Sequence, residues 1–71
     1  MSAGSVHVLY RAAVAADEAW SAELQLRYGR RAGDVRSTAE AKGLPHTTLR
    51  ALYDAKIAAD AAWVAESRRV F

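Results

Sequence analysis

Hydrophobic side chains recur along two stretches of the chain with the three-to-four-residue spacing of an amphipathic α-helix. Offsetting the sequence by 43 residues aligns these stretches, residues 9–23 and 52–66, and ten of the fifteen aligned positions are identical. The identities include one tyrosine, one aspartate and one tryptophan in each copy, which alanine-rich helices do not share by chance. The pattern therefore predicts an all-α fold, an antiparallel helical hairpin made by internal repetition.

Glycine and proline mark the expected ends of the two helices. Gly29 fits the left-handed residue that ends a helix, and Pro45 fits the first turn of one, with Thr47 as another possible cap. The expected elements of this single α-helical domain, residues 1–71, are a helix at about 5–28, a basic connector at 29–44 that is a loop or a short helix, and a helix at about 45–69.

The apolar face of the repeated helix is broader than one partner helix can cover. Its larger side chains, which we assign to the core and to a dimer interface, are Leu9, Tyr10, Trp20, Leu24, Leu52, Tyr53 and Trp63. A chain of 71 residues buries a small core, and without cysteines it has no disulfide to supplement it. We therefore expect a homodimer, arranged as a four-helix bundle. The alternative is that another protein covers the remaining apolar surface.

Charge is concentrated between the two repeats. The chain carries a net charge of +2, but residues 27–50 carry +4, residues 1–26 carry −2, and residues 51–71 are neutral. A solvated loop is one interpretation of this segment, and a docking site for a phosphate backbone or an acidic protein is the other. The candidate contact residues for a protein or nucleic acid are Arg27, Arg30, Arg31, Arg36, Lys42, His46, Thr47, Thr48 and Arg50.

Residues 37–52, Ser-Thr-Ala-Glu-Ala-Lys-Gly-Leu-Pro-His-Thr-Thr-Leu-Arg-Ala-Leu, resemble the helix-turn-helix of IclR-type winged-helix regulators, with its Gly-Leu-Pro-x-x-Thr form. In that motif Ala39 is small where two helices cross and Gly43 takes a left-handed turn. The side chains that fill the angle between the helices are Leu44, Leu49 and Leu52. The resemblance implies major-groove contacts by His46, Thr47, Thr48 and Arg50, and phosphate contacts by Arg30, Arg31 and Arg36.

A structural interpretation of the same segment involves no DNA. Ser37 with Glu40 three residues later can form a capping box at the start of a short connecting helix. The two interpretations make different use of the same residues, and both stay open at this point.

Asp17 and Asp60 occupy equivalent positions beside the apolar stripe of the two repeats. A carboxylate at such a position is costly unless it is paired or hydrogen-bonded. We interpret both as buried polar anchors that accept a hydrogen bond from a tyrosine hydroxyl, a tryptophan N–H or an arginine of the connector. A carboxylate-bridged metal site across a dimer is the rival interpretation. Metal sites in helical bundles usually add Glu-x-x-His pairs, which the sequence lacks.

No catalytic motif is recognisable. The sequence has no phosphate-binding glycine loop, nucleophile motif or His–carboxylate arrangement, and His7 and His46 have no companion at a metal-ligand spacing. We therefore expect no enzyme activity, cofactor, metal or small-molecule substrate. With no signal-peptide pattern and no uncharged run of about 20 residues, we expect a cytoplasmic protein that does not enter a membrane.

In its length, its alanine content and its preference for arginine over lysine, the whole chain resembles short orphan helical proteins of phages and mobile elements in high-GC bacteria. That resemblance implies an effector that binds a macromolecule. The expectation is therefore a small dimeric binding protein that contacts a protein partner through its basic turn. The alternative is a helix-turn-helix DNA-binding transcriptional regulator that uses residues 37–53.

Overall fold

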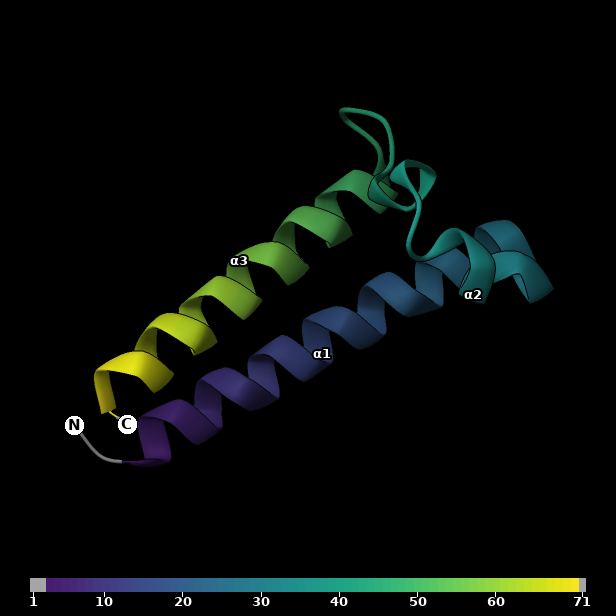
Figure 1. Ribbon diagram of the computed structural model, residues 1–71. Coiled ribbons are helices and arrows are strands. Elements are labelled where there is room, and N and C mark those ends of the chain that lie inside the picture. The colour runs from purple at the N-terminus through teal and green to yellow at the C-terminus, as the bar shows by residue number, and fades with distance from the viewer. Residues whose placement is uncertain (1–2, 71) are drawn as a thin grey trace.

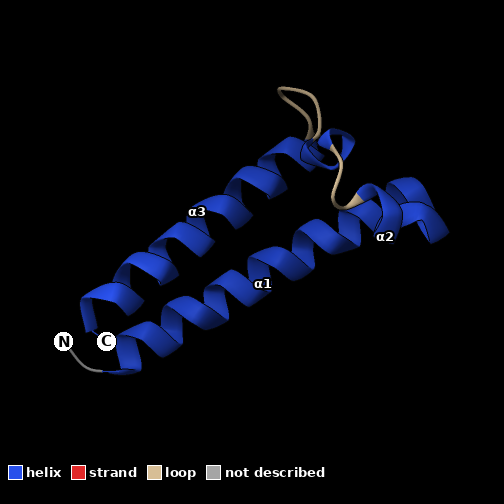
Figure 2. Cartoon of the chain, viewed as in Figure 1, coloured by secondary structure: helices blue, strands red, loops and turns tan. Residues whose placement is uncertain are grey.

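Two long helices lie side by side and run in opposite directions in the computed structural model, which describes residues 3–70 (Figure 1). The elements in chain order are α1 (Ala3–Tyr28), the 3-10 turn η1 (Gly29–Arg31), the short helix α2 (Ala32–Val35), the 3-10 turn η2 (Ala39–Lys42) and α3 (Thr48–Val70). Within the described residues there is no strand, so the all-α prediction is confirmed (Figure 2). None of these helices has an apolar stretch long enough to cross a membrane.

The ends of the long helices follow local backbone chemistry. Gly29 has a φ of 57° and ends α1 in the left-handed conformation, as expected. The second long helix begins at Thr48 rather than at Pro45, because His46 has a φ of 68° and interrupts the helical path between them. Thr47 is the cap, since its hydroxyl oxygen accepts a hydrogen bond of 3.2 Å from the backbone N–H of Arg50.

The connector also differs from the capping box that its sequence permits. Thr38, not Ser37, precedes η2, and its side chain makes no capping hydrogen bond. Instead the Thr38 hydroxyl donates to the backbone oxygen of Val35 at 2.6 Å, which holds the turn between α2 and η2. Gly43 follows η2 with a φ of 79°, and an added Cβ would lie 2.7 Å from the backbone nitrogen of Arg50. The chain can make this turn only with glycine.

The hydrophobic core lies at the connector end of the molecule. Its buried members come from all three parts of the chain: Trp20, Leu24, Ala32, Val35, Ala41 and Leu49, with Tyr28, Leu52 and Tyr53 packed against them. Trp20 is 4% exposed, and its indole N–H donates to the backbone oxygen of Ala41 at 2.9 Å. The connector is therefore a layer of the core, which neither the solvated-loop interpretation nor the docking-site interpretation of its sequence predicted.

Two aromatic contacts join the long helices. The rings of Tyr10 and Trp63 have centroids 5.4 Å apart, and those of Trp20 and Tyr53 have centroids 5.6 Å apart. Each contact pairs the tyrosine of one sequence repeat with the tryptophan of the other. Both tilted geometries are favourable for aromatic rings. The second contact is covered by the connector, whereas Trp63 stays partly exposed.

Leu44 is a correction to the expected packing. It is 75% exposed, whereas the helix-turn-helix resemblance implied that it fills an interhelical angle. The reason is the loop at residues 43–47, which extends away from the helices at the top of Figure 1. Leu49 is buried as expected, and Leu52 packs against the core.

The unequal burial of the two tryptophans predicts unequal effects of one substitution. Trp20→Phe removes the donor to Ala41 and leaves that buried carbonyl unpaired, so the free energy of unfolding should fall by about 2 kcal/mol. Trp63→Phe keeps an aromatic ring against Tyr10 and should cost less than about 1 kcal/mol. Urea denaturation followed by circular dichroism measures both. Equal losses would contradict a core centred on Trp20.

Candidate binding site

A groove of about 530 Å³ opens between the connector and the first half of α3. Its walls combine three cationic side chains with two aromatic rings. The residues that line it are Trp20, Gly33, Arg36, Ser37, Thr38, Ala39, Lys42, Tyr53, Lys56 and Ile57. The residues that line it include no carboxylate, although Asp17 and Asp60 pair with two of its three cations.

Three elements position the groove. Helix α1 supplies Trp20, and the connector crosses above it because the indole N–H holds the backbone of Ala41. Helix α3 supplies Tyr53 and Lys56, which are three residues apart and therefore share one helical face. Lys42, the last residue of η2, extends from the connector toward the same space.

Each cation of the groove lies against an aromatic ring. The guanidinium carbon of Arg36 is 4.6 Å from the ring centroid of Trp20, and the Lys56 ammonium is 5.6 Å from it. The Lys42 ammonium is 5.9 Å from the ring centroid of Tyr53. These separations fall within the range of favourable cation–π contacts. The rings thus hold three positive charges close together.

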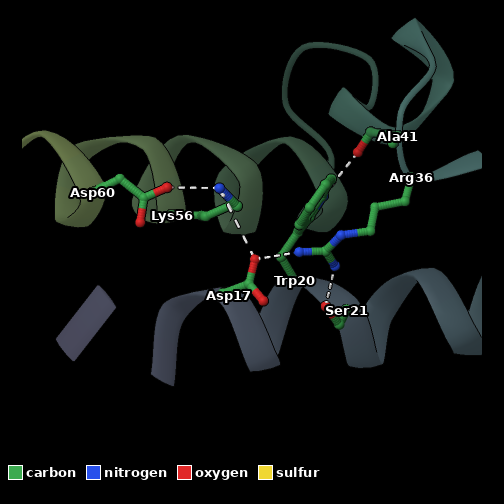
Figure 3. A network of polar contacts seen from close by, with 7 residues as sticks. All are labelled: Asp17, Trp20, Ser21, Arg36, Ala41, Lys56 and Asp60. Atoms are coloured by element: carbon green, nitrogen blue, oxygen red, sulfur yellow. Dashed lines mark hydrogen bonds and ion pairs between the residues drawn. The ribbon is translucent and has the colours of Figure 1, made fainter. Parts of the chain in front are cut away.

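Asp17 ties the connector to α1. Its Oδ1 atom accepts a hydrogen bond of 2.5 Å from Arg36, whose guanidinium also donates to the Ser21 hydroxyl (Figure 3). Lys56 donates to Asp60 at 2.6 Å, and its ammonium lies 3.9 Å from Asp17. Of the three donors that the sequence left open for Asp17, the structure selects an arginine of the connector.

Neither aspartate is buried, which corrects the prediction of buried polar anchors. The side chains of Asp17 and Asp60 are 36% and 41% exposed, and no charged residue is buried in the described part of the chain. The reason is their position on the side of the apolar stripe, where the two helices alone do not cover them. Within one copy of the chain, residues 3–70 contain no group of three or more His, Cys, Asp or Glu side chains that could hold an ion.

The candidate contact residues of the connector have separate roles. Arg36 and Thr47 make contacts within the chain, as described above, and Arg27 and Arg50 form ion pairs along their own helices with Glu23 and Asp54. The other candidate residues are exposed and have no carboxylate partner in the described chain: Arg30, Arg31, Lys42, His46 and Thr48. Of these, Lys42 lines the groove. The nine residues therefore differ in whether a contact within the chain already engages them.

Lys56 is a groove residue that the sequence analysis did not assign to binding. It lies in the second repeat at the position where the first repeat has Ala13. The sequence signal that could have identified Lys56 is a charged residue in place of an alanine on the apolar stripe. Tyr53, which was assigned to the core, contacts Trp20 edgewise and also lines the groove.

At the far end of α3, a hydrogen bond from Arg69 lowers the pKa of Glu66, and the same bond raises the pKa of Arg69. The Arg69 side chain is exposed, whereas the Glu66 side chain is 12% exposed.

Comparison with known proteins adds no functional assignment. No protein-family model, curated protein or solved structure matches this chain. The functional inference therefore depends on the groove, the charges and the exposed side chains.

The contacts of Arg36 predict that it stabilises the fold, whereas Arg30, which lies in the same connector, should not. Arg36→Gln removes the pair with Asp17 and the contact with Trp20, and because both partners are partly exposed the free energy of unfolding should fall by about 1 kcal/mol. Amide hydrogen exchange at residues 32–42 should accelerate. Arg30→Gln, which removes no described ion pair, should change neither quantity. Identical behaviour of the two variants would show that Arg36 does not hold the connector.

Proposed function

We propose that this protein is a small non-enzymatic binding protein that docks an acidic surface of a partner protein at its connector end. The observation that carries the proposal is the combination of uncompensated positive charge with exposed leucine side chains. Arg30 and Arg31 are exposed and form no ion pair with a described carboxylate. Leu26 and Leu44, from α1 and the loop before α3, are 83% and 75% exposed.

This combination is typical of a protein interface. Large apolar side chains that stay in water in the free protein gain free energy when a partner covers them. Arginine is enriched at interfaces because its stem packs while its guanidinium makes directed hydrogen bonds. Opposite charge on the partner accelerates encounter and fixes orientation. The connector end thus has the features that an acidic partner with apolar patches would recognise.

A charge-reversal pair tests the location of this surface. Arg30→Glu with Arg31→Glu should weaken binding to poly-L-glutamate, a mimic of an acidic surface, by about tenfold or more at about 0.1 M salt. Arg68→Glu with Arg69→Glu makes the same change in net charge at the opposite end of the 40 Å long molecule and should have a much smaller effect. Fluorescence anisotropy of the labelled polymer measures both affinities. Equal losses would mean that overall charge, not the connector end, governs binding.

DNA binding through residues 37–53 is the alternative function. A row of basic residues and the Gly-Leu-Pro-x-x-Thr sequence support it. The protein-partner proposal is preferred because the Thr47 hydroxyl caps α3 and Arg50 pairs with Asp54, so both would have to exchange partners to contact bases. A single 3-10 turn, η2, stands where the first helix of the motif is expected.

The DNA alternative has its own expected outcome. Regulation by DNA binding requires an affinity for mixed-sequence duplex DNA that falls steeply with salt, because phosphate contacts release counterions. That affinity should be lost in Arg50→Ala, with the circular dichroism spectrum unchanged. If duplex DNA binds in this manner while poly-L-glutamate does not bind, the protein-partner proposal is wrong.

We further propose that the helix pair arose by internal repetition and that two copies associate as a four-helix bundle. The crossed ring contacts support repetition, since tyrosine meets tryptophan in both. Trp20 and Leu24 are buried within one chain and are not available to a second copy. The side of the stripe that stays exposed carries Tyr10 and Val14 on α1, with Ile57 and Val64 on α3. We therefore propose that the dimer interface lies on this exposed side and not at the centre of the stripe.

The dimer proposal predicts a change of mass on substitution at that side. The wild-type protein should sediment as a dimer at micromolar concentration. Val14→Lys places a charge in the proposed interface and should give monomers. Val8→Lys makes the same change at a valine on another side of α1, which is 65% exposed against 38% for Val14, and should leave the dimer intact. Sedimentation equilibrium distinguishes the two, and a monomeric wild type would overturn the proposal.

A further inference from the structure

We propose that the cationic groove beside Trp20 receives one carboxylate side chain of the partner protein, flanked in the partner by apolar side chains. The inference rests on the proposed function and deepens it by naming the chemistry of the element that the partner inserts. Three properties of the groove support it: its net charge, the hydrogen-bond donors that are still free to bind a ligand, and a second hollow that shares a lining residue with it.

The charge balance favours a single negative charge. Arg36, Lys42 and Lys56 contribute three positive charges, and Asp17 and Asp60 pair with two of them. Lys42 forms no ion pair with any described carboxylate. The positive charge of Lys42 is therefore in excess. A single carboxylate compensates it fully, whereas a phosphate dianion would leave one negative charge uncompensated.

The donors that remain available lie on the connector side. Arg36 is already engaged with Asp17 and Ser21, and Lys56 with Asp60 (Figure 3). The Thr38 hydroxyl donates to Val35. The Lys42 ammonium and the hydroxyl of the neighbouring lining residue Ser37 have no hydrogen-bond acceptor among the described residues. An ammonium and a hydroxyl on one wall suit a carboxylate, which accepts charge-assisted hydrogen bonds through both oxygens.

The aromatic rings act as supports for the cations rather than as stacking platforms. Arg36 and Lys56 lie over Trp20, and Lys42 lies near Tyr53. A planar ligand would have to displace these cations to stack on the rings. The groove thus selects its ligand by charge, and its apolar wall at Ala39 and Ile57 can cover the aliphatic part of the same side chain or of its neighbours.

A second hollow indicates that the ligand is part of a chain. A cavity of about 260 Å³ on the other side of η2 is lined by Arg27, Tyr28, Glu40, Leu44 and others, and shares Ala39 with the groove. An extended segment that crosses η2 can place a carboxylate in the groove and an apolar side chain against the exposed Leu44. A free small acid can occupy the groove alone and would gain nothing from the second hollow.

Two matched peptides test the proposal. The probe is acetyl-Leu-Glu-Leu-amide, and its control is acetyl-Leu-Gln-Leu-amide, which differs only in charge. Nuclear magnetic resonance follows the indole N–H of Trp20, which is hydrogen-bonded to the residue preceding Lys42, while the indole of Trp63 serves as an internal control. We expect a saturable shift of the Trp20 resonance alone, with the Glu peptide bound about tenfold more tightly than the Gln peptide.

A pair of variants locates the effect. Lys42→Gln should abolish the preference for the Glu peptide, with an unchanged circular dichroism spectrum as evidence of folding. Arg30→Gln removes the same charge outside the groove and should keep the preference. Equal binding of the two peptides, or an equal effect of the two variants, would overturn the proposal. Glutarate that binds as tightly as the Glu peptide would also overturn it, since the groove would then be a site for free organic acids.

The outcome is separable from that of the proposed function. If Lys42→Gln changes nothing but the Arg30/Arg31 charge reversal still weakens binding to poly-L-glutamate, the groove proposal fails and the connector-end surface stands. If the charge reversal has no effect, the proposed function fails by itself.

Discussion

The hydrogen bond from the Trp20 indole to the carbonyl of Ala41 is the contact on which the rest of the molecule depends. Two alanine-rich helices have few large side chains to bury, so they need a third layer at one end. The connector supplies that layer with Ala32, Val35 and Ala41, and the indole fixes its position over α1. Once the connector is in place, Arg36 reaches Asp17 and the groove walls are defined.

The two aligned stretches, residues 9–23 and 52–66, differ around this contact. Their ring contacts remain equivalent, but the connector covers Trp20 and leaves Trp63 partly exposed. The change from Ala13 to Lys56 introduces a charge between two aspartates that both repeats keep. Together with Arg36 and Lys42 of the connector, Lys56 places three cations beside the rings of Trp20 and Tyr53. The groove therefore depends on the connector and on one position at which the two aligned stretches differ.

Local sequence was sufficient to predict the two long helices and the residue that ends the first one, because periodicity and left-handed glycine depend on near neighbours. It was not sufficient at Pro45, since the left-handed conformation of His46 delays the start of α3. It also placed Leu44 in the interior and both aspartates among buried groups. Those expectations were wrong because exposure depends on where the loop and the connector lie, and no periodic pattern encodes that.

The sequence by itself determined the helical class, the repeated pattern of tyrosine, aspartate and tryptophan, and the concentration of positive charge between the repeats. The pairs of Arg27 with Glu23 and of Arg50 with Asp54 follow helical spacing, but only the tertiary structure decided that Arg36 is paired and which charges line a groove. The physical reason is distance along the chain. Trp20 and Ala41 are 21 residues apart, and Arg36 and Asp17 are 19 apart, so these contacts follow from packing rather than from helical spacing. A helix pattern can mark a residue as polar, but only its neighbours in space decide whether it holds the fold together or faces a partner.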